Sequence, residues 1–225
     1  MLYKKFLFVV MLATLCFFSS CFQVIEEINI SNNGSGTVTL TVNLSSSKAK
    51  VASIMLLDSV NGYKVPTRLK IQQEMDEVVA YLKNSPGIGN VTKRLDFDNY
   101  IATVSFSFRN ISNINNINQR VLKKLKVNAV SNSSYTYNPA NNVFQRNYMH
   151  TSQAVLQYNK LKPEVKNVFK QATYTSIYRF ERPVVSMSNP LAKTSNTKRA
   201  VMLNTGILGL INGKTDISNK IILAK

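Results

Sequence analysis

The sequence predicts an α+β fold, in which an antiparallel β-sheet built from hairpins has helices packed on one face. Strand-like segments come in pairs joined by short turns, which is the sequence pattern of β-hairpins. The clearest strand alternates apolar and polar residues from Val38 to Leu44. Amphipathic helical segments separate the hairpins, and helices of this length must cover one face of an antiparallel sheet. This order of elements excludes a doubly wound parallel fold.

The first hairpin pairs residues 24–30 with residues 38–44. Glycines in the turn at 31–36 supply the positive φ angles that a tight turn requires. The alternation of the first strand is imperfect around Glu26. A helix capped by serines is expected to follow over residues 45–57.

A stronger amphipathic helix begins at Pro66, a residue that suits the first helical turn, and ends near residues 84–87. One face of this helix is apolar and consists of Ile71, Met75, Val78, Val79 and Leu82. The second hairpin joins residues 91–95 to residues 100–108 across a turn at 96–99. The segment between the two helices, 57–66, is a weak candidate for a domain boundary.

The second half of the chain repeats this alternation. A helix is expected over 112–126, and a third hairpin over 135–149 around an Asn-Pro turn. A helical stretch over 151–170 contains Pro163, which should kink or split it. Short strands and loops complete the chain. Because the length of 225 residues suits one domain, residues 21–225 are expected to form a single lipid-anchored domain.

Residues 1–20 are expected to form a signal peptide. Two lysines precede a run from Phe6 to Phe18 that is apolar except for Thr14, and the small residues Ser19 and Ser20 follow. The run is shorter than the roughly 20 apolar residues that span a bilayer. An uncleaved N-terminal anchor helix is the alternative.

Cys21 is the predicted lipidation site, with cleavage between Ser20 and Cys21. A thiolate is nucleophilic enough to take a diacylglyceryl group, and two or three acyl chains hold a domain on a membrane permanently. The other cysteine, Cys16, would be removed with the signal peptide, so the mature chain has no internal disulfide. An incidental cysteine near an ordinary cleavage site is the alternative interpretation.

The formal net charge of +17 is unevenly distributed. Residues 22–98 carry eight basic and eight acidic side chains, whereas residues 99–225 carry eighteen and three. An exported protein has no access to nucleic acid, so a nucleic-acid partner is not expected. A basic C-terminal half would instead face anionic lipid or acidic glycan; a generally basic, solubilising surface is the alternative. The residues predicted to form this anionic-surface site are Lys123, Lys124, Lys126, Lys160, Lys162, Lys166, Lys170, Arg179 and Arg182.

Few residues offer chemistry. His150 is the single histidine, which excludes a zinc site built from several histidines and cysteines, and no metal site or cofactor is expected. No nucleophile elbow, dinucleotide motif or phosphate loop is present. We therefore expect a protein that is not an enzyme. The alternative is an envelope hydrolase that uses dispersed residues such as Asp96, Asp98 and His150.

The N-terminal segment Phe18-Ser-Ser-Cys21 resembles the lipobox of bacterial lipoproteins, with the Phe that Bacteroidetes-type lipoproteins tolerate in place of the usual Leu. Asp58-Ser59-Val60 resembles their O-glycosylation motif, with Ser59 as the acceptor. The segments that follow Cys21 and surround residues 183–190 resemble uncharacterised LppM-like lipoproteins. That resemblance implies a curved antiparallel sheet that can enclose an apolar groove for a lipid-like ligand.

Together these observations predict an exported lipoprotein of the cell envelope, anchored through acylated Cys21 to a bacterial membrane, with the outer membrane favoured. Its expected role is that of a non-catalytic binding or assembly module.

Overall fold

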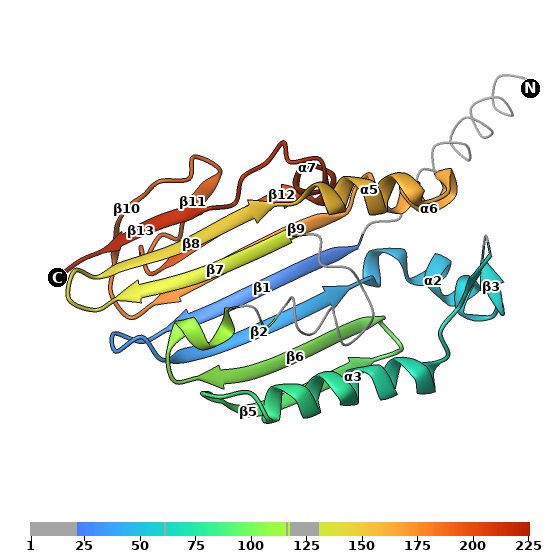
Figure 1. Ribbon diagram of the computed structural model, residues 1–225, viewed down its shortest axis with the longest axis horizontal. Coiled ribbons are helices and arrows are strands. Elements are labelled where there is room, and N and C mark those ends of the chain that lie inside the picture. Colours follow the sequence, from blue (N-terminus) through green and yellow to red (C-terminus); the bar gives the residue numbers. More distant parts are fainter. Residues whose placement is uncertain (1–21, 61, 116, 118–130) are drawn as a thin grey trace, which may run out of the picture.

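A computed structural model describes residues 22–60, 62–115, 117 and 131–225 (Figure 1). The predicted signal peptide at 1–20, the predicted lipidation site Cys21 and the predicted surface residues Lys123, Lys124 and Lys126 lie outside the described residues. No helix within the described part is long and apolar enough to cross a membrane.

Seven strands form the large sheet. Their order across it is β11 (Ala192–Thr194), β12 (Ala200–Gly206), β9 (Thr173–Phe180), β1 (Gln23–Ile30), β2 (Gly36–Asn43), β6 (Ile101–Phe108) and β5 (Ile88–Asp96). All neighbouring strands are antiparallel except β1 and β9, which are parallel.

A second sheet of four strands lies over the β9–β1 part of the large sheet (Figure 1). Its order is β10 (Val184–Met187), β13 (Asn219–Leu223), β8 (Val143–His150) and β7 (Ser131–Asn138). A separate two-stranded hairpin consists of β3 (Ser59–Val60) and β4 (Tyr63–Lys64).

The helices flank these sheets. The described helical segments are η1 (Ser45–Ser47), α2 (Lys48–Met55), α3 (Arg68–Lys83), η2 (Ile111–Ile114), α5 (Ser152–Lys160), α6 (Pro163–Phe169) and α7 (Ile207–Ile211). The α3 helix packs on β5 and sends apolar side chains to the inner face of the large sheet, the face that the second sheet also covers.

Strand register arranges the inner face of the large sheet in four rows, each with one residue from β9, β1, β2 and β6. The first row lies at the end where β1 begins, and the fourth where β1 ends. The first row is Tyr174, Val24, Val42 and Ala102; the second is Ser176, Glu26, Leu40 and Val104; the third is Tyr178, Ile28, Val38 and Phe106; the fourth is Phe180, Ile30, Gly36 and Phe108.

The hydrophobic core lies against the third and fourth rows. Phe144 of the second sheet is fully buried there, with its ring 4.9 Å from the ring of Tyr178 and 5.6 Å from that of Phe180. In the fourth row, Gly36 makes room for Phe108, because a Cβ at Gly36 would lie 2.7 Å from the Phe108 ring and 1.9 Å from the Asn29 carbonyl oxygen.

The outer face of the large sheet is polar. Hydroxyl pairs join β2 to β6 there, Thr39 to Ser105 at 2.9 Å and Thr41 to Thr103 at 3.2 Å. One covered face and one polar face are typical of antiparallel sheets, and they confirm the predicted α+β class and the alternation over 38–44.

The structure also differs from the prediction in five details. The third hairpin belongs to the second sheet, and one parallel pair makes the large sheet mixed. The helix expected over 112–126 is wrong at its start, because η2 ends at Ile114 and Asn115 is extended. Beyond Asn115, Ile117 is described as helical, and the other residues of that helix lie outside the described residues. The predicted serine cap of the first helix makes no capping hydrogen bond, and Asn43 accepts from the Ser45 amide instead. The predicted linker 57–66 contains β3 and β4.

Candidate functional site: an apolar cavity with a buried polar end

A cavity of about 500 Å³ lies against the first two rows of the large sheet. This volume is typical of small-molecule sites, which measure about 300–1,000 Å³. Most of its lining is apolar: Val24, Leu40, Val42, Met75, Val78, Leu82, Ala102, Val104, Phe106, Ile114, Ile117, Ile207, Leu210, Ile211 and Ile217. The polar lining residues are Glu26, Thr41, Asn132, Ser133, Arg146, Tyr148 and Tyr174.

Residue size explains why the cavity forms at this end of the sheet. Across β1, β2 and β6 the first row contains only Val24, Val42 and Ala102, whereas β6 contributes the rings of Phe106 and Phe108 to the third and fourth rows. The rings of the second sheet pack on those later rows. The space over the first two rows is bounded by α3, η2 and α7, so the cavity reaches the end of the sheet at which β1 begins.

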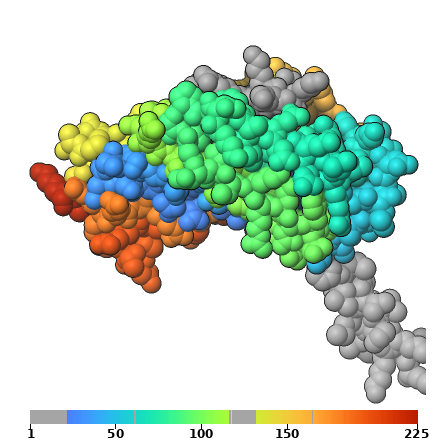
Figure 2. Space-filling model, turned by 90° about the horizontal axis from the view of Figure 1, so that it is seen from below, coloured from blue at the N-terminus to red at the C-terminus, as the bar shows by residue number. Residues whose placement is uncertain are grey.

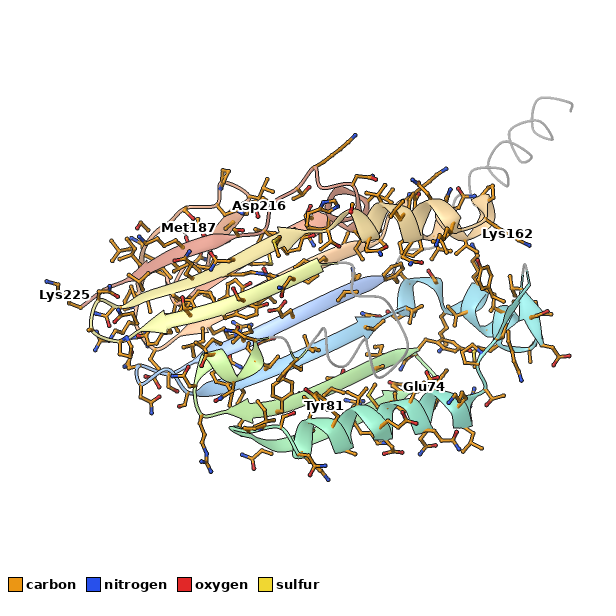
Figure 3. All side chains as sticks on the ribbon, in the orientation of Figure 1. Glu74, Tyr81, Lys162, Met187, Asp216 and Lys225 are labelled. Atoms are coloured by element: carbon orange, nitrogen blue, oxygen red, sulfur yellow. The ribbon has the colours of Figure 1, made fainter. Side chains whose placement is uncertain are left out.

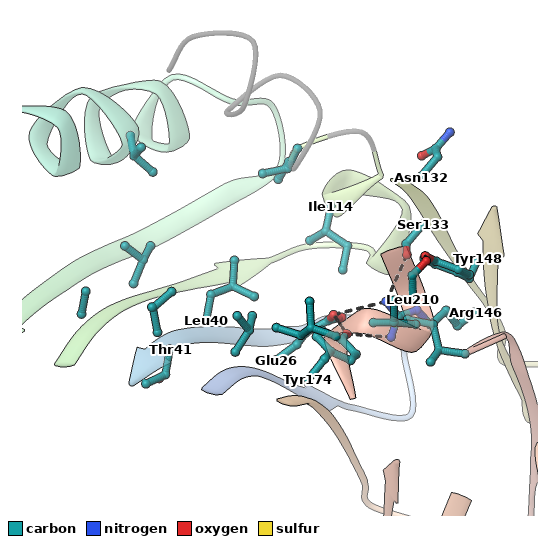
Figure 4. A pocket seen from close by; sticks show the side chains of 18 of the residues that line it. Glu26, Leu40, Thr41, Ile114, Asn132, Ser133, Arg146, Tyr148, Tyr174 and Leu210 are labelled. Atoms are coloured by element: carbon teal, nitrogen blue, oxygen red, sulfur yellow. Dashed lines mark hydrogen bonds and ion pairs between the residues drawn. The ribbon is translucent and has the colours of Figure 1, made fainter. Parts of the chain in front are cut away.

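An ion pair closes the inner end of the cavity, where Glu26 of β1 meets Arg146 of β8 (Figure 4). The two residues are only 5% and 3% exposed, and Nη2 of Arg146 lies 3.6 Å from Oε2 of Glu26. Strand alternation directs both side chains inward, because Glu26 lies between Val24 and Ile28 in the apolar series. A buried charge is costly unless it is paired and hydrogen-bonded, and here each charge has a partner.

Hydroxyl groups complete the polar end. Tyr135 donates to Oε1 of Glu26 at 2.5 Å, and Tyr174 donates to Oε2. Nη1 of Arg146 donates to the hydroxyls of Tyr174 and Tyr178, each at 2.8 Å, and Nη2 donates to Oγ of Ser133 at 3.0 Å. Within the described residues, Nε of Arg146 is buried without a hydrogen-bond partner. Both carboxylate oxygens are thus occupied, and Glu26 is not a free base.

Burial keeps the three tyrosines neutral. It raises the pKa of Tyr135 and of Tyr174 well above the ordinary phenol value, although the charge of Arg146 acts in the opposite direction. It raises the pKa of Tyr178 to about 12. Each hydroxyl therefore keeps its proton at neutral pH, and Tyr135 and Tyr174 donate theirs to Glu26.

These pKa shifts predict an alkaline limit to stability. A phenol with a folded-state pKa above its unfolded value of about 10 stabilises the native state fully below pH 10, and this stability is lost as the pH rises through the folded-state pKa. In a titration of residues 21–225 followed by tyrosinate absorbance and circular dichroism, we expect these three of the nine tyrosines to ionise only as the protein unfolds. Ionisation of all nine near pH 10 with an unchanged dichroism spectrum would contradict this.

Four of the predicted basic surface residues come together on α5 and α6. Lys160 ends α5, Lys162 precedes α6, Lys166 lies in α6 and Lys170 follows it. The first, second and fourth are exposed. The ammonium of Lys166 instead donates to the backbone oxygen of Asn159 at 3.0 Å.

The two predicted arginines lie elsewhere. Arg179 is near the far end of β9, about 20 Å from the end that follows α6 at roughly 3.3 Å per residue. It pairs with Glu27 at 2.7 Å, and Arg182 donates to Oδ1 of Asn142 at 2.8 Å. The described residues therefore form two separate basic groups.

Other predicted residues lie outside the cavity lining. Asp96 and Asp98 lie at the turn between β5 and β6, where Asp96 accepts backbone hydrogen bonds from Asp98 and Asn99. His150 ends β8, and its Nε2 lies 2.8 Å from the carbonyl oxygen of Ile211. Ser59 is exposed at the start of β3. Within the described part of the chain, no group of three or more His, Cys, Asp or Glu residues could hold a metal ion.

The similarity to known proteins lies among solved structures. No family model matches the sequence, and no curated protein matches it. Among solved structures, the NMR structure of the folded domain of LppM from Mycobacterium tuberculosis is similar, with 12% identity, coverage of 92% of each chain and a TM-score of 0.45. A similarity of this size assigns no residue role and no ligand, and a Bacteroidetes-type origin stays a prediction.

Proposed function

We propose that this chain is an exported lipoprotein, anchored through acylated Cys21 to a bacterial membrane, with the outer membrane favoured. Its domain acts as a non-catalytic binding module of the cell envelope. The cavity holds the apolar part of an amphipathic molecule, and the basic helices α5 and α6 face anionic headgroups or acidic glycan.

The cavity and its lining carry this proposal. Fifteen of the twenty-two lining residues are apolar, and the polar ones include a hydrogen-bonded group at one end. Ligand sites in proteins have this composition, with apolar walls and a few polar groups that orient the ligand. A lipid chain in the cavity with its polar group against Glu26 and Arg146 satisfies both kinds of surface.

The short separation in sequence between Cys21 and the cavity supports the proposed lipid anchor. Val24, which lines the first row of the cavity, lies three residues after Cys21. Three extended residues reach about 10 Å. A lipid on Cys21 would therefore hold the open end of the sheet close to the membrane, where amphipathic ligands are most concentrated.

The binding proposal explains the site better than the hydrolase alternative. Asp96, Asp98 and His150, the residues on which that alternative depends, do not line the cavity. Glu26, the acidic side chain that does line it, is held between two tyrosine hydroxyls and beside Arg146. A general base needs a free acceptor near a reacting group.

Mass spectrometry and ligand titration test the two parts of this proposal. The mature N-terminus purified from membranes should be a diacylated or triacylated Cys21, and an unmodified cysteine or another start would refute the anchor.

Because Glu26 and Arg146 cancel one another's charge, the cavity should prefer an uncharged polar group. Monopalmitoylglycerol should bind at least about tenfold more tightly than ionised palmitate, a difference of about 1.4 kcal/mol. Failure of both probes to bind would refute the cavity's role.

A further inference from the structure

We propose that residues 56–60 and 62–64 form a membrane-insertion tip, by which the domain docks end-on to the bilayer that holds its lipid anchor. This inference rests on the proposed anchoring at Cys21, and it adds the surface that meets the membrane and the orientation of the domain. The partner is the lipid leaflet itself.

The tip is unusually apolar for an exposed surface. Leu56 is 88% exposed, and Leu57 and Tyr63 are each about half exposed. Leu56 and Leu57 are neighbours that follow the end of α2, and Tyr63 begins β4, where it pairs with Val60 of β3. Exposed apolar residues gathered on one short segment mark an interaction site. None of these three side chains lines the cavity.

The tip lies at the end of the molecule from which the predicted anchor emerges. Phe22, the residue after Cys21, packs its ring 5.5 Å from that of Phe169 in α6, and Tyr158 of α5 packs on the same ring at 5.8 Å. The junction of α5 and α6 in turn reaches the tip, because a methyl group at Gly62 in the β3–β4 turn would lie 3.9 Å from Nζ of Lys162 (Figure 3).

Charge around the tip suits an anionic leaflet. Lys64 belongs to the tip, and Lys160 and Lys162 are exposed at the neighbouring junction of α5 and α6. Asp58 is the acidic residue of the tip. Basic residues near an anionic bilayer are attracted to its headgroups, and exposed leucine and tyrosine side chains suit the interface itself. A soluble protein partner would not explain why this segment lies at the end of the domain where Phe22, the first described residue, packs on α6.

The opposite end of the domain lies far from the tip and from Phe22. The C-terminus, β10 and β13 lie there, far from α2 and β3 (Figure 2). Val185 of β10 is 67% exposed, which makes it a matched control for an exposed apolar residue away from the membrane. End-on docking also brings the first row of the sheet, and with it the cavity, towards the leaflet.

The absence of tryptophan from the sequence allows a direct test. The full acylated lipoprotein carrying Leu57→Trp or Val185→Trp is reconstituted into vesicles of phosphatidylethanolamine and phosphatidylglycerol, with and without brominated acyl chains. We expect brominated lipid to quench the tryptophan fluorescence at position 57 by more than half and to leave the fluorescence at position 185 unchanged. Leu56→Trp provides a second reporter on the tip, and circular dichroism verifies folding.

The outcomes separate docking from anchoring. If the protein sediments with the vesicles but neither tip reporter is quenched, or if the reporter at 185 is quenched equally, the docking proposal is overturned and the anchor stands. If the wild-type protein remains in the supernatant, the anchor fails and docking fails with it. A glycan on Ser59 of the mature protein would also overturn docking, because a bulky polar group there cannot enter a bilayer.

Discussion

Replacing Arg146 with methionine is expected to destabilise the domain by about 3–5 kcal/mol, because the substitution leaves Glu26 as an unpaired buried charge. The methionine fills a similar volume, so the loss reports the charge and its hydrogen bonds rather than an empty space. The wild-type guanidinium contacts Tyr174, Tyr178 and Ser133 as well as Glu26. Urea unfolding of the two proteins measures the difference.

Arg179→Met is the matched control. Arg179 of β9 pairs with Glu27 of β1 at 2.7 Å on the outer face of the large sheet, but about half of its side chain is exposed. An exposed ion pair contributes about 0–1 kcal/mol. Equal losses for the two arginine variants would show that the pair between Glu26 and Arg146 is not the buried pair described above.

A double-mutant cycle isolates the pair from its surroundings. Glu26→Gln keeps an oxygen that can accept from the tyrosine hydroxyls but removes the charge. Combined with Arg146→Met, it should cost less than the sum of the two single substitutions, with a coupling of about 0.5–3 kcal/mol. Strict additivity would mean that the two charges do not stabilise one another.

Much of the fold follows from local sequence periodicity. The strands at 24–30, 38–44 and 101–108 alternate in the way that one covered face requires, and short turns let β1 pair with β2 and β5 pair with β6 without long-range information. The helix predicted to begin at Pro66 begins instead at Arg68, because the Thr67 hydroxyl accepts from the Lys70 amide at 3.1 Å and caps α3.

Contacts between distant segments could not be predicted in this way. The parallel pairing of β1 with β9 joins residues about 150 positions apart, and nothing in either strand specifies its partner. The second sheet arises because β13 pairs with β8, again far apart in sequence. The local pattern of an amphipathic strand is the same in either sheet.

The polar end of the cavity left only a partial signal in the sequence. Glu26 interrupts an apolar alternation, and Arg146 occupies the same kind of position between Phe144 and Tyr148. Two inward-facing charges of opposite sign on different strands predict a buried pair, because each needs a partner. Arg146 is one of eighteen basic residues in the second half of the chain, so the charge distribution alone does not distinguish it from a surface cation.

Replacing Ala102 with phenylalanine is expected to abolish most binding of monopalmitoylglycerol without unfolding the protein. Ala102 is the smallest residue of the first row, and its side chain faces the cavity. A phenyl ring there occupies space that a lipid chain would need, so the affinity should fall at least about tenfold, or 1.4 kcal/mol. Filling a cavity commonly raises stability by about 0.5–2 kcal/mol, so the urea midpoint should stay the same or increase.

Thr103→Phe tests whether this loss comes from the cavity itself. Thr103 is the next residue of β6 and faces the polar side of the sheet, where its hydroxyl meets that of Thr41 at 3.2 Å. A ring at this position changes the same strand by a similar volume but leaves the cavity open. Unchanged affinity in Thr103→Phe and loss in Ala102→Phe place the ligand under the first row. If both variants lose affinity equally, the sheet rather than the cavity is responsible; if neither does, the ligand binds elsewhere on the protein.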